Sequence, residues 1–266
     1  QKVANQSGIP PQNFVCVDEN GSIGWTIMGR IPRRVGFDGS LPTSWADGTR
    51  GWDGWLPPED YPRVIDPASG VIWTANARVV EGEMLAKIGD GGYDQGARAR
   101  QIRDALLALD QADEADMLSV QLDDRALFLD RWHIFLLELL NDEAARESPA
   151  RSEARDLLRS TWSGRASIDS VAYRIVRAFR NSTFERVYGW LTAPCIEADE
   201  RFHLYELSQY EGPLWKLVTE KPPHLLDPAY ASWEEALLTV FDEVAFELGA
   251  EEEAFDLRAK TWGERN

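Results

Sequence analysis

Asn76 is a residue whose type and position in the sequence could do chemistry. It follows Val71–Ala75, a run of β-branched and aromatic residues that predicts a strand. A carboxamide N–H at a strand end can donate a hydrogen bond to a developing alkoxide, as in an oxyanion hole, and the strand gives it a rigid base. Asn at such a position is also a common turn former. The spacing alone leaves both interpretations open.

Trp45, Trp52 and Trp55 could bind a ligand by stacking, because they lie in a long Gly- and Asp-rich loop within Arg30–Ser69. If the rings are exposed, they predict a sugar-binding platform, and a carbohydrate-binding module is then an alternative function. If they are buried, which is the commoner state of Trp, they are packing residues. The segment also holds six prolines, which are Pro32, Pro42, Pro57, Pro58, Pro62 and Pro67. Since Pro fixes φ and lacks an N–H, we expect this segment to wrap over a surface and to stay out of a central sheet.

The composition excludes several classes of partner. The 266 residues carry 28 basic and 45 acidic side chains, a formal net charge of -17, which repels nucleic acid and anionic lipid. No apolar run reaches the about 20 residues that span a bilayer, so we expect no membrane insertion. Two cysteines, Cys16 and Cys195, are too few for a disulfide scaffold or a Cys-based zinc site, and they could be buried thiols or one bridge. The histidines His133, His203 and His224 lack metal-ligand spacing.

The elements that must position Asn76 are short strands. Phe14–Val17 and Ser22–Met28 predict a hairpin around the Asp18–Gly21 turn, and Val71–Ala75 predicts a third strand. From Ala97 onward the apolar residues recur at helical spacing. Expected helices are Ala97–Leu109, a short helix capped by Asp113, Arg125–Leu140, Pro149–Trp162 capped by Ser148, Asp169–Leu191, Ala198–Tyr210 and Ser232–Leu248.

These patterns predict an α+β fold with few antiparallel strands in residues 1–76 and a large, mainly helical region in residues 97–266. As domains, we expect a β-rich segment, 1–96, that carries the long Pro- and Trp-rich loop, and a helical region, 97–266, packed together with it as one unit. A helical domain that binds another protein is a further alternative, because the helices of residues 97–266 could fold without the strands.

An ordered series of Pro, Gly and Trp residues resembles the penicillin acylase (penicillin amidase) family of N-terminal-nucleophile hydrolases. The matching segments are Gly29–Arg34, Asp38–Pro42, Gly51–Pro57 and Ser69–Asn76, with support from Asp18–Trp25 and Trp162–Ser170. The resemblance covers nearly the whole chain. It implies that the chain is an internal portion of the family's β chain and a fragment of its αββα fold.

The resemblance also implies roles for two residues. Asn76 matches the family's catalytic Asn, which donates to the oxyanion of the amide being cleaved. Gly96–Ile102 matches the start of the next helix, which places the family's Arg at Arg98, with Arg100 as the alternative if the register slips. A guanidinium is permanently charged and can orient Asn76 through several donors.

The family's nucleophile, a Ser at the start of the β chain, would lie upstream of Gln1. We therefore expect an intact precursor to hydrolyse linear amides and this chain alone to be inactive, because acyl transfer has no first step without a nucleophile. The implied substrates are small-molecule acyl amides of the penicillin G or acyl-homoserine lactone type. The implied protein partners are the remaining α chain and the N-terminal part of the β chain.

No cofactor is implied, and no metal site is predicted in this chain. The family often binds a structural calcium, but most of those ligands fall outside this sequence, and Lys87 stands where a carboxylate is expected. Asp90 and Asp94 follow and are interpreted as solvated loop residues. The resemblance implies a periplasmic or extracellular location, although Gln1–Gln12 lacks the apolar core of a secretory signal.

Overall fold

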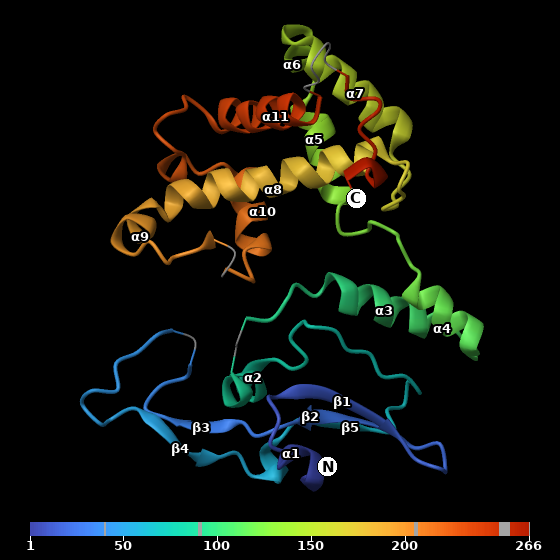
Figure 1. Ribbon diagram of the computed structural model, residues 1–266, viewed down its shortest axis with the longest axis vertical. Helices are drawn as coiled ribbons and strands as arrows, with labels where there is room; N and C mark the ends of the chain where they lie inside the picture. Colours follow the sequence, from blue (N-terminus) through green and yellow to red (C-terminus); the bar gives the residue numbers. More distant parts are fainter. Residues whose placement is uncertain (40, 90–91, 205–206, 250–255, 266) are drawn as a thin grey trace. The chain divides into compact units, whose positions relative to one another are not determined.

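The chain divides into two compact units, and the boundary between them lies after residue 121. The computed structural model describes residues 1–39, 41–89, 92–204, 207–249 and 256–265. The units are Gln1–Gln121, blue to green in Figure 1, and Leu122–Asn266, green to red. The sequence suggested a division at residue 96. Helices α3 (Ala97–Leu107) and α4 (Glu114–Gln121) fall in the first unit, and neither has a fully buried side chain.

The first unit is built on a three-stranded antiparallel sheet with the strand order β1–β2–β5. The strands span Gln12–Val17 (β1), Ile23–Met28 (β2) and Arg63–Ile65 (β5). β1 and β2 form the predicted hairpin, with Val15 opposite Trp25. Its turn is closed by Asp18, whose Oδ1 accepts from the backbone N–H groups of Asn20 and Ser22 at 2.9 and 3.0 Å.

The segment Arg30–Ser69 contains three strands, so the prediction that it stays out of the sheet is wrong. Strand β5 pairs with β2 in the central sheet, while β3 (Pro32–Val35) and β4 (Gly51–Trp55) form a separate antiparallel pair. The prolines allow this because Pro32 is the first residue of β3 and the other five lie outside the strands, four of them between strands and Pro67 after β5.

A small apolar core joins this sheet to helix α2 (Gly82–Ile88), and helix α1 (Lys2–Asn5) contacts strand β2. Its buried members are Trp25, Ile27, Ile31, Tyr61 and Ile88. The Tyr61 hydroxyl accepts from the Ile31 N–H at 2.8 Å and donates to the Gly29 carbonyl at 3.0 Å. Burial raises the pKa of Tyr61 above its ordinary value. The neutral phenol therefore fixes the chain between β2 and β3.

The second unit is helical, and two of its helices begin at the serines that the sequence predicts as N-caps. Ser148 Oγ accepts from the Arg151 N–H at 3.5 Å, and Ser232 Oγ accepts from the Glu235 N–H at 3.1 Å. The helices are α5 (Asp130–Leu139), α6 (Asp142–Glu147), α7 (Pro149–Thr161), α8 (Val171–Leu191), α9 (Ala193–Ala198), α10 (Glu211–Glu220) and α11 (Trp233–Gly249). Short 3-10 helices span Pro58–Asp60 in the first unit and Pro223–Leu225 and Gly263–Arg265 in the second.

Two predicted helices have different bounds in the structure. Helix α5 begins at Asp130 and not at Arg125, because the Ala126 N–H donates to the Gly164 carbonyl at 2.7 Å and Arg125 pairs with Arg165 in a β-bridge. The helix expected over Ala198–Tyr210 is wrong for residues 199–203 and 207–210, which form turns and irregular backbone. Residues 205 and 206 lie outside the described residues.

Helix α8 is central to the core of the second unit, where it contacts α5, α7 and α11. The largest fully buried side chains include Trp132, Phe179 and Phe241. One carboxylate, Glu211, is also buried, with 5% of its surface exposed. It accepts hydrogen bonds from the Trp132 indole at 2.7 Å and the Arg180 guanidinium at 2.7 and 2.9 Å, and it pairs with Arg131. These donors are what allow a charge to remain in an apolar core.

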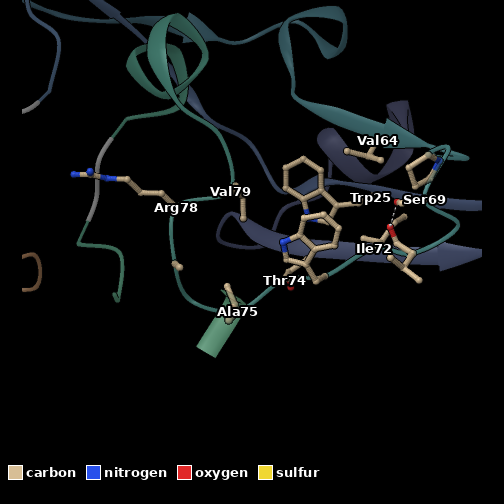
Figure 2. A pocket seen from close by; sticks show the side chains of 13 residues that line it. Trp25, Val64, Ser69, Ile72, Thr74, Ala75, Arg78 and Val79 are labelled. Atoms are coloured by element: carbon tan, nitrogen blue, oxygen red, sulfur yellow. Dashed lines mark hydrogen bonds between the residues drawn. The ribbon is translucent and has the colours of Figure 1, made fainter. Parts of the chain in front are cut away.

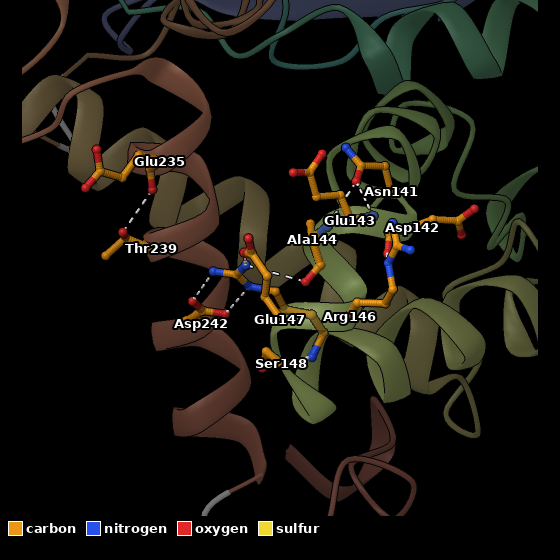
Figure 3. A network of polar contacts seen from close by, with 11 residues as sticks. Asn141, Asp142, Glu143, Ala144, Arg146, Glu147, Ser148, Glu235, Thr239 and Asp242 are labelled. Atoms are coloured by element: carbon orange, nitrogen blue, oxygen red, sulfur yellow. Dashed lines mark hydrogen bonds and ion pairs between the residues drawn. The ribbon is translucent and has the colours of Figure 1, made fainter.

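Arg151 fastens α7 to α11 at the surface of the same core. Its Nε and Nη2 donate to the two carboxylate oxygens of Asp242 at 2.8 and 2.6 Å, and its Nη1 donates to Glu147 at 2.9 Å. Asp242 and Glu147 are labelled in the network of polar contacts in Figure 3. The hydrogen bonds that Arg151 donates to Asp242 raise the pKa of the guanidinium. A bidentate pair of this kind fixes orientation as well as distance.

Two further features concern membrane-spanning helices and the two cysteines. In the described ranges, no helix combines the length and the apolar character needed to cross a membrane. Cys16 and Cys195 are both exposed, so neither is the buried thiol that the sequence left open as one alternative.

Candidate functional site

Asn76 stands at the end of an extended segment that pairs with no strand, so the predicted strand Val71–Ala75 is wrong. The three-stranded sheet β1–β2–β5 does not include this segment. The segment is held by single contacts. Asn13 Nδ2 donates to the Ala75 carbonyl at 3.1 Å, and Ala77 forms a parallel β-bridge with Asp94.

Arg98 and Asn76, the two residues selected from the sequence, contact each other in the structure. Arg98 is the second residue of α3, and its Nη2 donates to Asn76 Oδ1 at 2.8 Å. A guanidinium only donates, so the Asn76 atom that faces it is the oxygen, and the amide nitrogen takes the other side of the carboxamide. This is the orientation in which Asn76 can donate to an oxyanion. The Arg98 side chain is 64% exposed.

Asp94 is the third member of the cluster, and it was not selected from the sequence. Its Oδ2 accepts from Arg98 Nη2 at 3.1 Å, and its backbone N–H donates to the Asn76 carbonyl at 2.9 Å. Asp94 is exposed, with 59% of its side-chain surface accessible, as expected of a solvated loop residue, and it also contacts both Arg98 and the Asn76 backbone. The signal that could have identified it is its position four residues before Arg98, at the entry to a helix, where opposite charges pair.

The other residues weighed in the sequence lie elsewhere. The Lys87 ammonium pairs with Asp60 at 3.2 Å. The side chain that contacts Asn76 is that of Arg98, so the alternative register with Arg100 is not needed. In the part of the chain that the structure describes, no three His, Cys, Asp or Glu side chains are grouped to hold a metal ion, and Asp90 lies outside that part.

Two pockets flank the segment that carries Asn76. One is an apolar pocket of about 330 Å³ whose lining includes Trp25, Val64 and Ile72 (Figure 2). The other, of about 320 Å³, is lined by Asn76 itself together with polar neighbours that include Asp94. Ala75, Ala77 and Val79 line both pockets. An acyl amide presents an apolar chain and a polar amide, and pockets of these two kinds lie within a few residues of Asn76.

Ser69 lines the apolar pocket but is not arranged as a nucleophile. Its Oγ donates its proton to the Val71 carbonyl at 3.3 Å, as Figure 2 shows, and a carbonyl cannot act as a general base. The described cluster therefore places a carboxamide, Asn76, beside a guanidinium, Arg98, that donates to its oxygen.

Comparison with known proteins identifies the group to which this chain is related. The sequence model of penicillin amidases matches residues 1–266. The chain belongs to the penicillin amidase family. The resemblance seen in the Pro-, Gly- and Trp-rich series is thereby confirmed over its whole length.

Two relatives in the penicillin amidase family show how much of an acylase this chain represents. Acyl-homoserine lactone acylase QuiP from Pseudomonas aeruginosa is 32% identical over 215 residues, which are 79% of this chain and 24% of that protein. Penicillin acylase 2 proenzyme from Pseudomonas sp. (strain SE83) is 30% identical over 175 residues, 66% of this chain and 22% of that protein. The chain thus spans about a quarter of the length of these relatives.

A solved structure of the same family confirms the fold class. The thermostable penicillin G acylase from Alcaligenes faecalis superposes with a TM-score of 0.55 at 19% identity, over 94% of this chain and 48% of that one. The α+β class, with few antiparallel strands followed by many helices, is confirmed by this similarity. The roles of Asn76 and Arg98 stay predictions.

Proposed function

We propose that this chain is part of an amidohydrolase that cleaves a linear acyl amide, and that Asn76 donates to the oxyanion of the reaction. The observation that carries the proposal is the hydrogen bond from Arg98 to Asn76 Oδ1 in a chain of the penicillin amidase family. That bond occupies the amide oxygen and directs the amide N–H groups away from Arg98. A preorganised neutral donor of this kind stabilises negative charge without losing a proton itself.

The proposed reaction uses a Ser that precedes Gln1 in the intact protein. Its Oγ attacks the amide carbonyl while its own α-amine accepts the proton, and the resulting oxyanion binds to Asn76 Nδ2 and a backbone N–H. The α-ammonium then gives this proton to the leaving nitrogen, so that collapse of the intermediate breaks the C–N bond, releases the amine and leaves an acyl ester on the Ser, which water then hydrolyses. On this proposal the present chain alone is inactive, and its partners are the α chain and the N-terminal part of the β chain.

The same proposal covers the substrate class of the intact enzyme, its structural calcium and its cellular location. The relatives' names refer to acyl-homoserine lactones and penicillins, so acyl amides of these two kinds are the substrates to test. The reaction needs no cofactor, and a structural calcium would be held by parts of the protein outside this chain. The intact enzyme would act in the periplasm or outside the cell, after self-cleavage of a precursor.

The test compares this chain with a polypeptide extended upstream through the proposed Ser. Both proteins are incubated with penicillin G and with an N-acyl-homoserine lactone, and the released amine is measured. The extended protein is expected to release amine and to show Ser at a newly formed N-terminus by mass spectrometry. This chain alone is expected to release none. Amine release by the short chain, or none by the extended protein, would contradict the proposal.

A carbohydrate-binding surface is a second candidate, favoured by the exposure of the three tryptophans of the β3–β4 region. Trp45, Trp52 and Trp55 are 45%, 60% and 51% exposed. Trp45 and Trp52 meet edge to face, with ring centroids 5.5 Å apart and planes at 63°, so a sugar could stack on one ring but not across both. Saturable quenching of Trp fluorescence by an oligosaccharide, abolished by Trp52→Ala, would support this candidate.

A further inference from the structure

Asp94 contacts Asn76 directly through the backbone and indirectly through the side chain of Arg98. On the main-chain side, the Asp94 N–H donates to the Asn76 carbonyl at 2.9 Å, and the next residue, Ala77, pairs with Asp94 in a parallel β-bridge. On the side-chain side, Asp94 Oδ2 accepts from Arg98 Nη2 at 3.1 Å. The same Nη2 donates to Asn76 Oδ1 at 2.8 Å. One residue thus determines both where the Asn76 backbone lies and where the guanidinium that orients its amide lies.

The chemistry of the guanidinium explains why a second acceptor matters. Each Nη atom carries two hydrogens, and on Nη2 of Arg98 one is directed to Asn76 and the other to Asp94. Arg98 is 64% exposed on its side chain, so a single hydrogen bond would leave it free to sample other rotamers in water. Two acceptors on one nitrogen restrict the plane of the guanidinium, and this restricts the amide of Asn76 in turn.

We propose that Asp94 is a positioning residue for the amide hydrolysis described above, acting through Arg98 and the Asn76 backbone on the oxyanion donor. The inference rests on the proposed function of Asn76. Asp94 itself does not touch the reacting atoms. The competing structural role is a carboxylate near the N-terminus of α3, whose N-cap, Gly96, provides no side-chain hydrogen bond. That role would affect the stability of the helix but not the rate of hydrolysis.

The test is a double-mutant cycle in the extended polypeptide that contains the proposed Ser. We expect Asp94→Ala to lower kcat about 10-fold, within the range for residues of one hydrogen-bonded network, with KM changed less than about twofold. Asp94→Asn keeps an acceptor oxygen and is expected to recover part of the loss. In an Arg98→Ala background, Asp94→Ala is expected to have much less effect. Asp53→Ala, which breaks the exposed Arg33–Asp53 pair, is the matched control and should leave kcat unchanged.

A second readout needs no activity and uses the chain as it stands. The side-chain amide resonances of Asn76 are identified in isotope-labelled protein by their loss in Asn76→Ala. Asp94→Ala is expected to shift them, whereas Asp53→Ala is not. An unshifted Asn76 amide overturns the positioning role, even if the extended polypeptide proves inactive and the proposed function fails. In an active enzyme, an unchanged kcat, or an equal loss with and without Arg98, overturns it as well.

Discussion

Arg98 Nη2 and Asn76 Oδ1 are joined by a hydrogen bond of 2.8 Å between residues 22 positions apart in the sequence. Asn76 lies on an extended segment without a strand partner, and Arg98 lies on the first turn of α3. Without that bond, either end of the carboxamide could face the substrate. With it, the oxygen is occupied and the N–H groups are presented, so Arg98 is expected to influence the reaction through Asn76.

Arg98→Lys in the extended polypeptide should lower kcat about 10-fold, the effect of one lost charge-assisted hydrogen bond. Lysine keeps the charge but lacks the planar fork that meets Asn76 and Asp94 together. Steady-state kinetics with an acyl amide measures the change. Arg100→Lys, on the same helix, is the matched control and should change kcat little. Equal losses in the two variants would show that the effect is one of general charge.

Glu211→Gln should destabilise the second unit by about 3–5 kcal/mol, because it leaves two arginines beside a carboxamide that cannot balance their charge. Glu211 is 5% exposed and receives hydrogen bonds from Arg131, Arg180 and Trp132. Urea unfolding of the chain measures the loss. Glu220→Gln changes an exposed carboxylate at the other end of α10 and should alter stability by less than about 0.5 kcal/mol. Similar values for both variants would contradict the assignment of Glu211 as a core residue.

Stability should fall as the pH rises above about 10, the ordinary pKa of tyrosine. Burial raises the pKa of Tyr61 and of Tyr188, so the folded chain keeps both phenols protonated where the unfolded chain ionises them. The contribution is complete below the unfolded pKa and is lost as the pH rises toward the folded pKa. Urea unfolding at a series of alkaline pH values measures it. Tyr61→Phe should flatten this dependence, and an unchanged slope would contradict the role of Tyr61.

A fragment that contains only residues 122–266 should unfold cooperatively. The second unit has its own apolar core around α8, which includes Trp132, Phe179 and Phe241. A domain of this size normally buries enough surface to fold alone. Trp fluorescence and circular dichroism should give coincident urea transitions, and Glu211→Gln should shift both. A broad, non-coincident transition would show that this unit depends on the first.

Periodicity and caps in the sequence were sufficient to place most helices, because Ser148 and Ser232 act locally. The pairing of Asn76 with Arg98 was predicted from the family resemblance and not from spacing. The strand expected over Val71–Ala75 failed because a strand needs a ladder of backbone hydrogen bonds to a partner, whereas this segment has only isolated contacts, from Asn13 to Ala75 and between Ala77 and Asp94. The spacing of four residues between Asp94 and Arg98 could have indicated their ion pair, but the β-bridge that joins Asp94 to Ala77 has no local sequence pattern.

The most direct test of the oxyanion role is the rate of the Asn76→Ala variant of the extended polypeptide. If Asn76 donates to the oxyanion, kcat should fall about 10²–10³-fold with little change in KM. Asn20→Ala, in the exposed β1–β2 turn, should be unaffected and serves as the matched control. An Asn76→Ala enzyme that folds and turns over at the wild-type rate would remove Asn76 from the mechanism.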